Sequence, residues 1–249
     1  MILHGKCALI TGGTRGIGAA AALALAREGC DVAINARKDS DEAASTLAAI
    51  RKLGRRAEFI AADLATGPCA EGLVRDSARA LGGLDILVHS AGGPVPGGLL
   101  EIKPEDWHAA LDVHLSAVFY LCRAAVPLIR ARKEGAIILV SSTAGIRGII
   151  TNVAYQVAKG ALPQFTRALA REFANDNIRV NCVAPGVIRT AFHAQMTEAQ
   201  RKLNLEQRIP LRREGTPEQV ASVIAELVKN DYITGETMTI DGGLTMRIA

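Results

Sequence analysis

The chain has 249 residues, of which 49% are hydrophobic and only 4% aromatic, and its formal net charge is +4. This length suits a single α/β domain spanning residues 1–249, and the 24 glycines and many alanines favour helices packed closely on a parallel sheet. The charges are spread along the chain without blocks, which argues against nucleic acid or an anionic membrane as a partner.

The cysteines and the N-terminal segment bear on the compartment. Five widely spaced cysteines predict neither a disulfide framework nor a CxxC metal site, so no metal is expected. The chain starts without a signal-peptide pattern, and no uninterrupted apolar run reaches membrane-spanning length. These features predict a cytoplasmic protein that is not attached to a membrane.

Short apolar runs alternate with alanine-rich helical patterns along the whole chain, which is typical of βαβ units. The predicted strands are Cys7–Ile10, Asp31–Asn35, Ala57–Ala61, Leu84–Ser90, Ala136–Ser141, Arg179–Ala184 and Thr237–Ile240. The predicted helices are Ile17–Glu28, Asp41–Leu53, Ala70–Leu81, Trp107–Arg132, Ala154–Asn175 and Glu218–Lys229. The pattern predicts one doubly wound, seven-stranded parallel sheet with helices on both faces, the Rossmann arrangement.

Two loops rich in glycine and proline directly follow predicted strands, at residues 92–98 and around Pro185-Gly186. Ligands of open α/β sheets bind outside the carboxyl ends of the strands, so these loops are candidate walls of a site. The connection Thr190–Arg213 is longer than the others and carries several apolar side chains, which suggests a lid.

The first strand leads into a glycine-rich turn, Thr11-Gly12-Gly13-Thr14-Arg15-Gly16-Ile17-Gly18, which opens a helix. Glycines at 12, 16 and 18 allow a tight turn and close approach to a pyrophosphate, and the helix N-terminus offers free N–H groups to the anion. An ordinary turn is the alternative. The strand before and the helix after favour a dinucleotide site.

The end of the second strand indicates which dinucleotide is bound. A free 2′-hydroxyl is usually held by a carboxylate here, whereas a 2′-phosphate is better matched by arginine. The strand ends without an acid and is followed by Arg37, and Arg15 in the turn is a second cation. We expect NADP(H) rather than NAD, unless both arginines simply face solvent.

Tyr155 and Lys159 are four residues apart and therefore neighbours on one helical face. Ser142 directly follows the preceding predicted strand, in the region where ligands bind. A nearby ammonium and an oxidised nicotinamide both favour the phenolate, so we expect the tyrosine pKa to fall by about three units from its usual ~10. Tyr155 would then be the acid/base, Ser142 would hydrogen-bond the substrate oxygen, and Lys159 would tune the tyrosine and anchor the nicotinamide ribose.

With these motifs together, the chain resembles the classical short-chain dehydrogenases/reductases over its whole length. The matching segments are Thr11–Gly18, Asp63-Leu64, Ser90-Ala91-Gly92, Ser142, Tyr155–Lys159, Asn181–Gly186, Ile233–Glu236 and Asp241–Gly243. The resemblance implies a homotetramer in which Asp63 and Leu64 contact the adenine, and Ser90 and Ile188 line the ribose and nicotinamide site. The expected cofactor-binding residues are Gly12, Thr14, Arg15, Gly16, Ile17, Gly18, Arg37, Asp63, Leu64, Ser90, Ala91, Gly92, Tyr155, Lys159, Pro185, Gly186, Ile188 and Thr190.

Three residues depart from the family pattern or from helix chemistry. His89 stands where the family usually has asparagine, and we expect it to hydrogen-bond within the sheet. His114 aligns with the asparagine that positions a water behind the lysine, so it either joins the proton relay or packs as a structural substitute. Since histidine titrates near ~6.5, we expect His114→Asn to shift the pH profile in the neutral range. Pro163 should remove one helical hydrogen bond and bend its helix.

The substrate stays open at the level of sequence. We expect a small-molecule ketone or secondary alcohol, and the overall pattern is most similar to 3-oxoacyl-[acyl-carrier-protein] reductases. Lys133 stands at a position where such enzymes bind the acidic carrier protein, but Asp176 stands where a second cation is common. The alternatives are a non-catalytic NADP-binding sensor, an NAD-dependent alcohol or sugar dehydrogenase, and a methyltransferase that shares only the glycine-rich turn.

Overall fold

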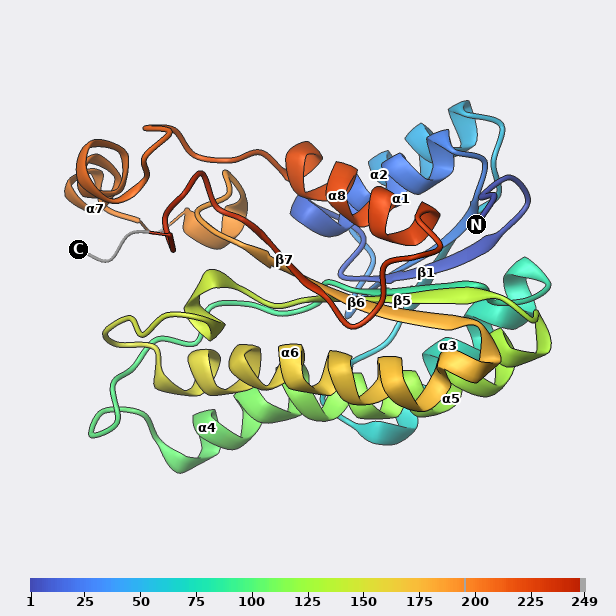
Figure 1. Ribbon diagram of the computed structural model, residues 1–249, viewed down its shortest axis with the longest axis horizontal. Helices are drawn as coiled ribbons and strands as arrows, with labels where there is room; N and C mark the ends of the chain where they lie inside the picture. The colour runs from blue at the N-terminus through green and yellow to red at the C-terminus, as the bar shows by residue number, and fades with distance from the viewer. Residues whose placement is uncertain (195, 247–249) are drawn as a thin grey trace.

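A seven-stranded parallel sheet forms the centre of the protein, with the strand order β3-β2-β1-β4-β5-β6-β7 (Figure 1). The computed structural model describes residues 1–194 and 196–246. The strands are β1 (Cys7–Thr11), β2 (Asp31–Ala36), β3 (Ala57–Ala61), β4 (Ile86–His89), β5 (Gly135–Val140), β6 (Ile178–Pro185) and β7 (Thr237–Ile240). The predicted fold class is therefore confirmed, and each predicted strand exists with ends shifted by at most two residues.

Helices cover both faces of the sheet (Figure 1). One face carries α1 (Gly16–Arg27), α2 (Asp41–Lys52) and α8 (Pro217–Lys229), and the other carries α3 (Gly67–Leu81), α5 (Ala117–Ala131) and α6 (Val153–Phe173). Each helix layer buries its own apolar core against the sheet. Small residues such as Ala21 and Ala22 in α1 are fully buried, which lets the helix backbone approach the strands closely.

The helix predicted over Trp107–Arg132 has different bounds and an irregular segment in the structure. It begins earlier, as α4 (Pro104–Leu111), passes through the π-helical segment η1 (Asp112–Ser116) and continues as α5. A π-helical turn inserts an extra residue without ending the helix, and such turns are frequent at functional sites. Residue periodicity alone does not reveal the insertion, because the flanking segments keep a helical pattern.

The long connection after β6 contains short helices that the sequence did not predict. They are η4 (Ala191–His193), α7 (Glu198–Leu203) and η5 (Asn204–Arg208), and Gln195 lies outside the described residues. A capping box formed by Thr197 and Gln200 starts α7. The segment lies at the end of the molecule where β6 ends, as a lid would (Figure 1).

The continuous helical stretch Pro104–Ala131 is long and apolar enough to cross a membrane by length and composition. Its α5 portion nevertheless packs on the sheet and against α3, with seven of its residues buried there. A core helix of a globular domain passes the same test, so this stretch is explained by the fold.

The strand order reverses between β1 and β4, since β2 and β3 extend to one side of β1 while β5, β6 and β7 extend from β4 to the other. In open α/β sheets the loops on the two sides of such a point diverge, and the crevice between them, at the carboxyl ends of the strands, is where ligands bind. The glycine-rich turn, Ser142 and the Tyr155 helix all start from this edge of the sheet.

Candidate active site

The glycine-rich turn after β1 has the conformation that its sequence predicts. Gly12 and Gly16 have φ angles of +63° and +56°, the left-handed region that favours glycine. A Cβ atom on Gly18 would lie 2.1 Å from the carbonyl oxygen of Gly12. Helix α1 therefore packs directly on the turn, which leaves its first N–H groups at the crevice.

The N-terminus of α1 is suited to an anion. Its N-cap residue, Arg15, provides no side-chain hydrogen bond to the helix, and the first turn contains no acidic residue. Its free N–H groups and the positive end of the helix dipole thus meet no competing carboxylate from the first turn. This terminus fits the pyrophosphate of a dinucleotide.

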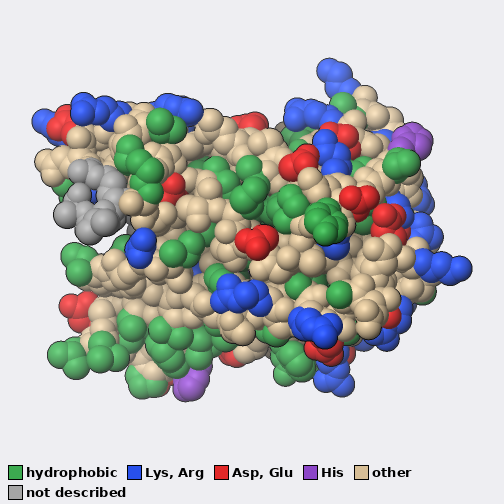
Figure 2. Space-filling model, in the orientation of Figure 1, with side chains coloured by type: hydrophobic (Ala, Val, Ile, Leu, Met, Phe, Trp, Pro, Cys, Tyr) green, Lys and Arg blue, Asp and Glu red, His purple; other side chains and the backbone are tan. Residues whose placement is uncertain are grey.

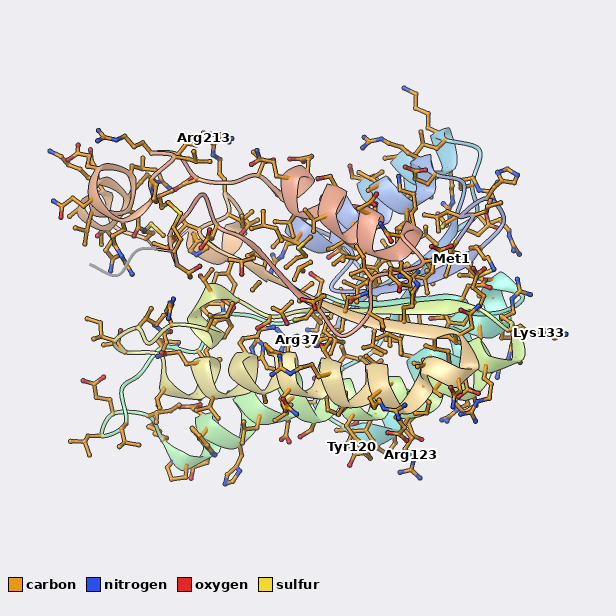
Figure 3. The ribbon with its side chains drawn as sticks, viewed as in Figure 1. Met1, Arg37, Tyr120, Arg123, Lys133 and Arg213 are labelled. Carbon is orange, nitrogen blue, oxygen red and sulfur yellow. The ribbon has the colours of Figure 1, made fainter. Side chains whose placement is uncertain are left out.

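Arg37, labelled in Figure 3, follows β2 and is exposed, as Arg15 is. Within residues 1–194 and 196–246, neither arginine forms a salt bridge. Asn35, the next-to-last residue of β2, is buried and its amide donates to the carbonyls of Ala36, Ile60 and Ala62. The end of β2 thus offers free cations and no carboxylate, which fits a 2′-phosphate.

Loops from β4 and β6 close on the glycine-rich turn. A Cβ atom on Gly12 would lie 2.8 Å from the Cα of Ala91, and one on Gly16 would lie 3.3 Å from Cγ2 of Thr190. Ser90 and Ala91 donate their backbone N–H groups to the Thr11 hydroxyl, each at 3.2 Å. The segments expected to bind the cofactor are therefore brought to one place.

The other expected cofactor residues lie at the same edge of the sheet. Asp63 is exposed just after β3, whereas the Leu64 side chain is buried in the core between the sheet and α3. Ile188 is buried and pairs with Gly215 in an isolated bridge. The remaining members of the set lie at a strand end, in the loops that follow strands or in the first turn of α1; they are Thr14, Ile17, Gly92, Pro185 and Gly186.

Tyr155 lies on the first turn of α6 and Ser142 follows the end of β5. Burial raises the pKa of Tyr155 above its ordinary value, and hydrogen bonding with Ser142 opposes the rise. In the protein alone, desolvation outweighs the Ser142 hydrogen bond. The fall of the tyrosine pKa beside an oxidised nicotinamide stays a prediction for the cofactor complex. The protein holds Tyr155 protonated at neutral pH.

Lys159 is 4% exposed, and its Nζ lies 5.8 Å from the centre of the Tyr155 ring. The ammonium donates to the carbonyl of Val140 at 2.7 Å. Burial lowers the pKa of Lys159 to about 8. The ammonium is thus held near Tyr155 by the strand that ends beside Ser142.

His114 lies in η1 and is 2% exposed, with its ring edge-on to Tyr155 at a centroid distance of 5.3 Å. Its Nε2 is 3.1 Å from the carbonyl oxygen of Gly93. Burial and the charge of Lys159 lower the pKa of His114 to about 3. The expectation that it titrates near neutrality is therefore wrong. The close packing of its ring on Gly92 leaves no space there for a Cβ atom.

His89 is fully buried in β4, and its Nδ1 is 3.0 Å from the Thr11 hydroxyl on the neighbouring strand. The expected hydrogen bond within the sheet is confirmed. Burial, Lys159 and His114 hold the pKa of His89 well below its usual value, so the ring is neutral.

Two contacts of the site have no signal in the sequence. The carbonyl of Val140 holds the Lys159 ammonium, and the hydroxyl of Ser141 donates to the backbone carbonyl of Lys159 at 2.7 Å. Backbone carbonyls are present at every residue, so only the register of β5 against α6 selects this one. Lys133, by contrast, precedes β5 and lies at the opposite end of the sheet (Figure 3).

Comparison with known proteins finds a family model and several relatives that match nearly the whole chain. A family model described as enoyl-(acyl carrier protein) reductase matches residues 12–245. A 3-oxoacyl-[acyl-carrier-protein] reductase from Synechocystis sp. is 38% identical, with 98% of each chain covered. A short-chain dehydrogenase from Burkholderia cenocepacia in complex with NADP has a TM-score of 0.89 and 37% identity, covering 98% of this chain and 99% of its own. L-sorbose reductase from Gluconobacter frateurii, complexed with NADPH and L-sorbose, has a TM-score of 0.91 and 31% identity, with both chains fully covered.

Proposed function

Because the chain belongs to the short-chain dehydrogenase/reductase family, we propose that it interconverts a ketone and a secondary alcohol with NADP(H), using Tyr155 as the acid/base. The observation that carries this proposal is the joint position of Ser142, Tyr155 and Lys159 beside a phosphate-binding turn. A non-catalytic sensor has no use for a phenol, a hydroxyl and a buried ammonium converging on one crevice. A methyltransferase equally lacks a role for the pair Tyr155 and Lys159.

NADPH, when bound, supplies the hydride. The residues of this chain then handle the proton and the oxygen. Tyr155, whose phenol is protonated at neutral pH, donates its proton to the substrate oxygen during reduction. Ser142 hydrogen-bonds that oxygen as charge develops on it. Lys159 places a positive charge near the phenol ring, which stabilises the phenolate that is left after the proton is donated.

The preference for NADP(H) over NAD rests on the end of β2. Arg37 and Arg15 supply cations. The one acid within residues 31–36 is Asp31, at the far end of the strand, so β2 places no carboxylate where it would bind a 2′-hydroxyl and repel a 2′-phosphate. The NADP and NADPH complexes of the two similar structures support the same preference. An NAD-dependent alcohol or sugar dehydrogenase is the second candidate.

A carrier protein as substrate partner has weaker support. The similar Synechocystis protein is named for this substrate. In this chain, however, Lys133 lies at the opposite end of the sheet from Tyr155, and Asp176 forms a 2.7 Å salt bridge with Arg130. We favour a free small-molecule ketone, with the protein acting in the cytoplasm as a homotetramer.

The test is NADPH oxidation followed by absorbance with a panel of ketones. We expect measurable turnover in the wild type and a loss of kcat of about 10²- to 10⁴-fold in Tyr155→Phe, the usual contribution of a general acid. NADPH binding, followed by its fluorescence, should weaken far less than kcat, because Tyr155→Phe removes only one of the expected cofactor contacts. Turnover that survives the substitution would remove Tyr155 from the proton step, and NADPH binding without turnover on any ketone or alcohol would favour the sensor.

A further inference from the structure

The loops that surround Tyr155 present apolar side chains outward. The loop after β5 carries Ile146, Ile149 and Ile150, which are 40%, 37% and 86% exposed. Leu99 and Leu100, in the loop after β4, are 75% and 99% exposed. Hydrophobic side chains gather at this end in Figure 2, where Figure 1 draws these loops facing the α7 segment.

These loops form one wall beside the acid/base. Gly97 donates its N–H to the carbonyl of Thr151 at 2.9 Å and accepts from Val153 at 3.2 Å, which joins the loops after β4 and β5. The side chain of Gln156, next to Tyr155, bonds both the N–H and the carbonyl of Ile149, at 2.7 and 2.6 Å. The wall is therefore tied directly to the turn of α6 that carries the phenol.

The lid side of the crevice is also apolar near the phenol. The ring of Phe192 in η4 lies 5.7 Å from the ring of Tyr155, and its side chain is 37% exposed. Its neighbour His193 turns its Nδ1 to the carbonyl of Ile188 at 2.9 Å. Two lid arginines, Arg189 and Arg201, both pair with the buried carboxylate of Glu214.

Polar side chains of the wall also bond to backbone. Thr151 donates to the carbonyl of Ile150 at 2.7 Å, and the Asn152 amide is 3.4 Å from the same carbonyl. Arg147 donates to the carbonyl of Thr245 from Nη2 at 3.1 Å. A hydroxylated substrate needs partners for each of its hydroxyls, whereas this wall offers mainly apolar contacts.

Building on the function proposed above, we infer that the substrate is a ketone whose body beyond the carbonyl is an apolar chain or ring rather than a polyhydroxylated sugar. Ile149 and Phe192 are the residues that select it. Each methylene buried against them adds favourable transfer free energy, so longer apolar ketones should react with higher kcat/KM.

The test measures kcat/KM with NADPH for the 2-alkanones from 2-butanone to 2-octanone, for cyclohexanone and its 4-alkyl derivatives, and for D-fructose and dihydroxyacetone. We expect kcat/KM to rise about fourfold per added methylene and to exceed that for the hydroxylated ketones. Ile149→Asn and Phe192→Asn should flatten this rise. The control Ile2→Asn changes an equally apolar side chain, 82% exposed near the N-terminus, and should leave the rise unchanged.

Two results would overturn the inference, and they have different meanings. Efficient reduction of D-fructose or dihydroxyacetone with a flat alkanone series would refute the apolar substrate while leaving the proposed reductase function intact. Absence of turnover on every ketone, with NADPH still bound, would refute the proposed function and this inference with it.

An independent observation concerns Pro163, which lies inside α6 four residues after Lys159. Proline has no N–H, so the Lys159 carbonyl lacks its helical partner four residues ahead. That carbonyl instead accepts from the Ser141 hydroxyl at 2.7 Å, while the Lys159 ammonium bonds the adjacent Val140 carbonyl. The backbone carbonyl and the side-chain ammonium of Lys159 are thus both held by residues at the end of β5.

We propose that Ser141 is a positioning residue: its hydroxyl replaces the helical donor that Pro163 lacks, and a satisfied Lys159 carbonyl keeps the catalytic turn of α6 in place. The close contact of the two elements agrees with this role, since a Cβ atom on Gly145 would lie 2.6 Å from the backbone carbon of Lys159. Removing the Ser141 hydroxyl leaves the Lys159 carbonyl buried without a donor, whereas an N–H at position 163 would supply one.

The test is a double substitution with rescue. We expect Ser141→Ala to lower kcat about tenfold with little change in KM, and Ser141→Ala/Pro163→Ala to return kcat to within about twofold of wild type, because residue 163 then donates to Lys159. Ser77→Ala is the control, since it removes a buried hydroxyl that also donates to a helix carbonyl at 2.7 Å, in α3. It should leave kcat unchanged.

A double variant no more active than Ser141→Ala would overturn the positioning role, and so would an equal loss of kcat in Ser77→Ala. If Ser141→Ala does not fold, Ser141→Thr and Pro163→Ala, which each keep a donor for Lys159, provide the measurement. Both should retain wild-type kcat, and a tenfold loss in either would contradict the proposal.

Discussion

His114 shows how burial changes the role of a residue in the site. Because a carbonyl oxygen only accepts, the Nε2 that faces Gly93 carries the proton, and the ring is neutral. Desolvation and the Lys159 charge lower the pKa of this histidine to about 3. The residue therefore holds the loop after β4 against Tyr155 without changing charge at physiological pH.

We expect His114→Asn to retain activity and to leave the pH profile of kcat unchanged between about pH 6 and pH 8, since a group with a pKa near 3 does not titrate there. An asparagine amide can still donate to the Gly93 carbonyl. The measurement is kcat against pH for both proteins. An inflection near pH 6.5 in the wild type that disappears in the variant would contradict the neutral role.

Arg37 carries a prediction about cofactor choice. Arg37→Asp should lower the ratio of kcat/KM for NADPH to that for NADH at least about tenfold, because a charge-assisted contact to the 2′-phosphate is replaced by repulsion. Lys52→Asp makes the same charge change at the exposed end of α2 and should leave the ratio unaltered. Equal ratios in wild type and Arg37→Asp would mean that Arg37 merely faces solvent.

Among the elements, the turn from β1 into α1 has little tolerance for added atoms. Gly18 lies in the first turn of α1 with its Cα against the Gly12 carbonyl, so the helix and the phosphate-binding turn share one packing contact. The π-helical segment η1 has a comparable role on the other face, where it carries His114 beside Tyr155. Both features place irregular backbone at the site, within otherwise regular elements.

Gly18→Ala should lower the free energy of unfolding by about 1–3 kcal/mol and weaken NADPH binding, because the new methyl group would lie 2.1 Å from the Gly12 oxygen. Gly72→Ala is the matched control inside α3, where no atom lies within 4 Å of the added Cβ. It should raise stability by about 0.5–1 kcal/mol, as alanine usually does in a helix interior. Urea unfolding of the two variants provides the comparison, and equal effects would contradict the packing argument.

At the scale of the whole molecule, the site places an ammonium inside the fold, which connects activity to stability. The pKa of Lys159 is about 8 in the folded protein against an ordinary 10.5, because burial disfavours the charged form. Between these values the unfolded chain binds more protons than the folded one, so this group makes the protein more stable as pH rises. The buried cysteines have raised pKa values and act in the opposite direction at high pH.

We expect the difference in unfolding free energy between wild type and Lys159→Met to shift by about 1 kcal/mol in favour of the wild type from about pH 7 to pH 9. Taking the difference cancels the cysteines, which both proteins share. Urea unfolding at the two pH values measures it. A difference that stays constant would mean that the pKa of Lys159 is not lowered in the folded protein.

The sequence by itself determined the fold class, the order of the motifs along the chain and the identity of the candidate chemical groups. Alternating apolar runs and glycine positions are local features, and they predict parallel βαβ units and a phosphate-binding turn without knowledge of distant contacts. Ser142, Tyr155 and Lys159 follow from spacing and from their positions at element ends.

The tertiary structure decided what depends on burial and on contacts between distant segments. Desolvation, which no local pattern reveals, raises the pKa of Tyr155 and keeps His114 neutral. The π-helical turn at Asp112–Ser116, the capture of the Lys159 carbonyl by Ser141 and the apolar wall beside Phe192 arise only when the sheet and helices pack together. The sequence supplied the candidate side chains, and packing set their pKa values and their surroundings, because both depend on neighbours that lie far apart along the chain.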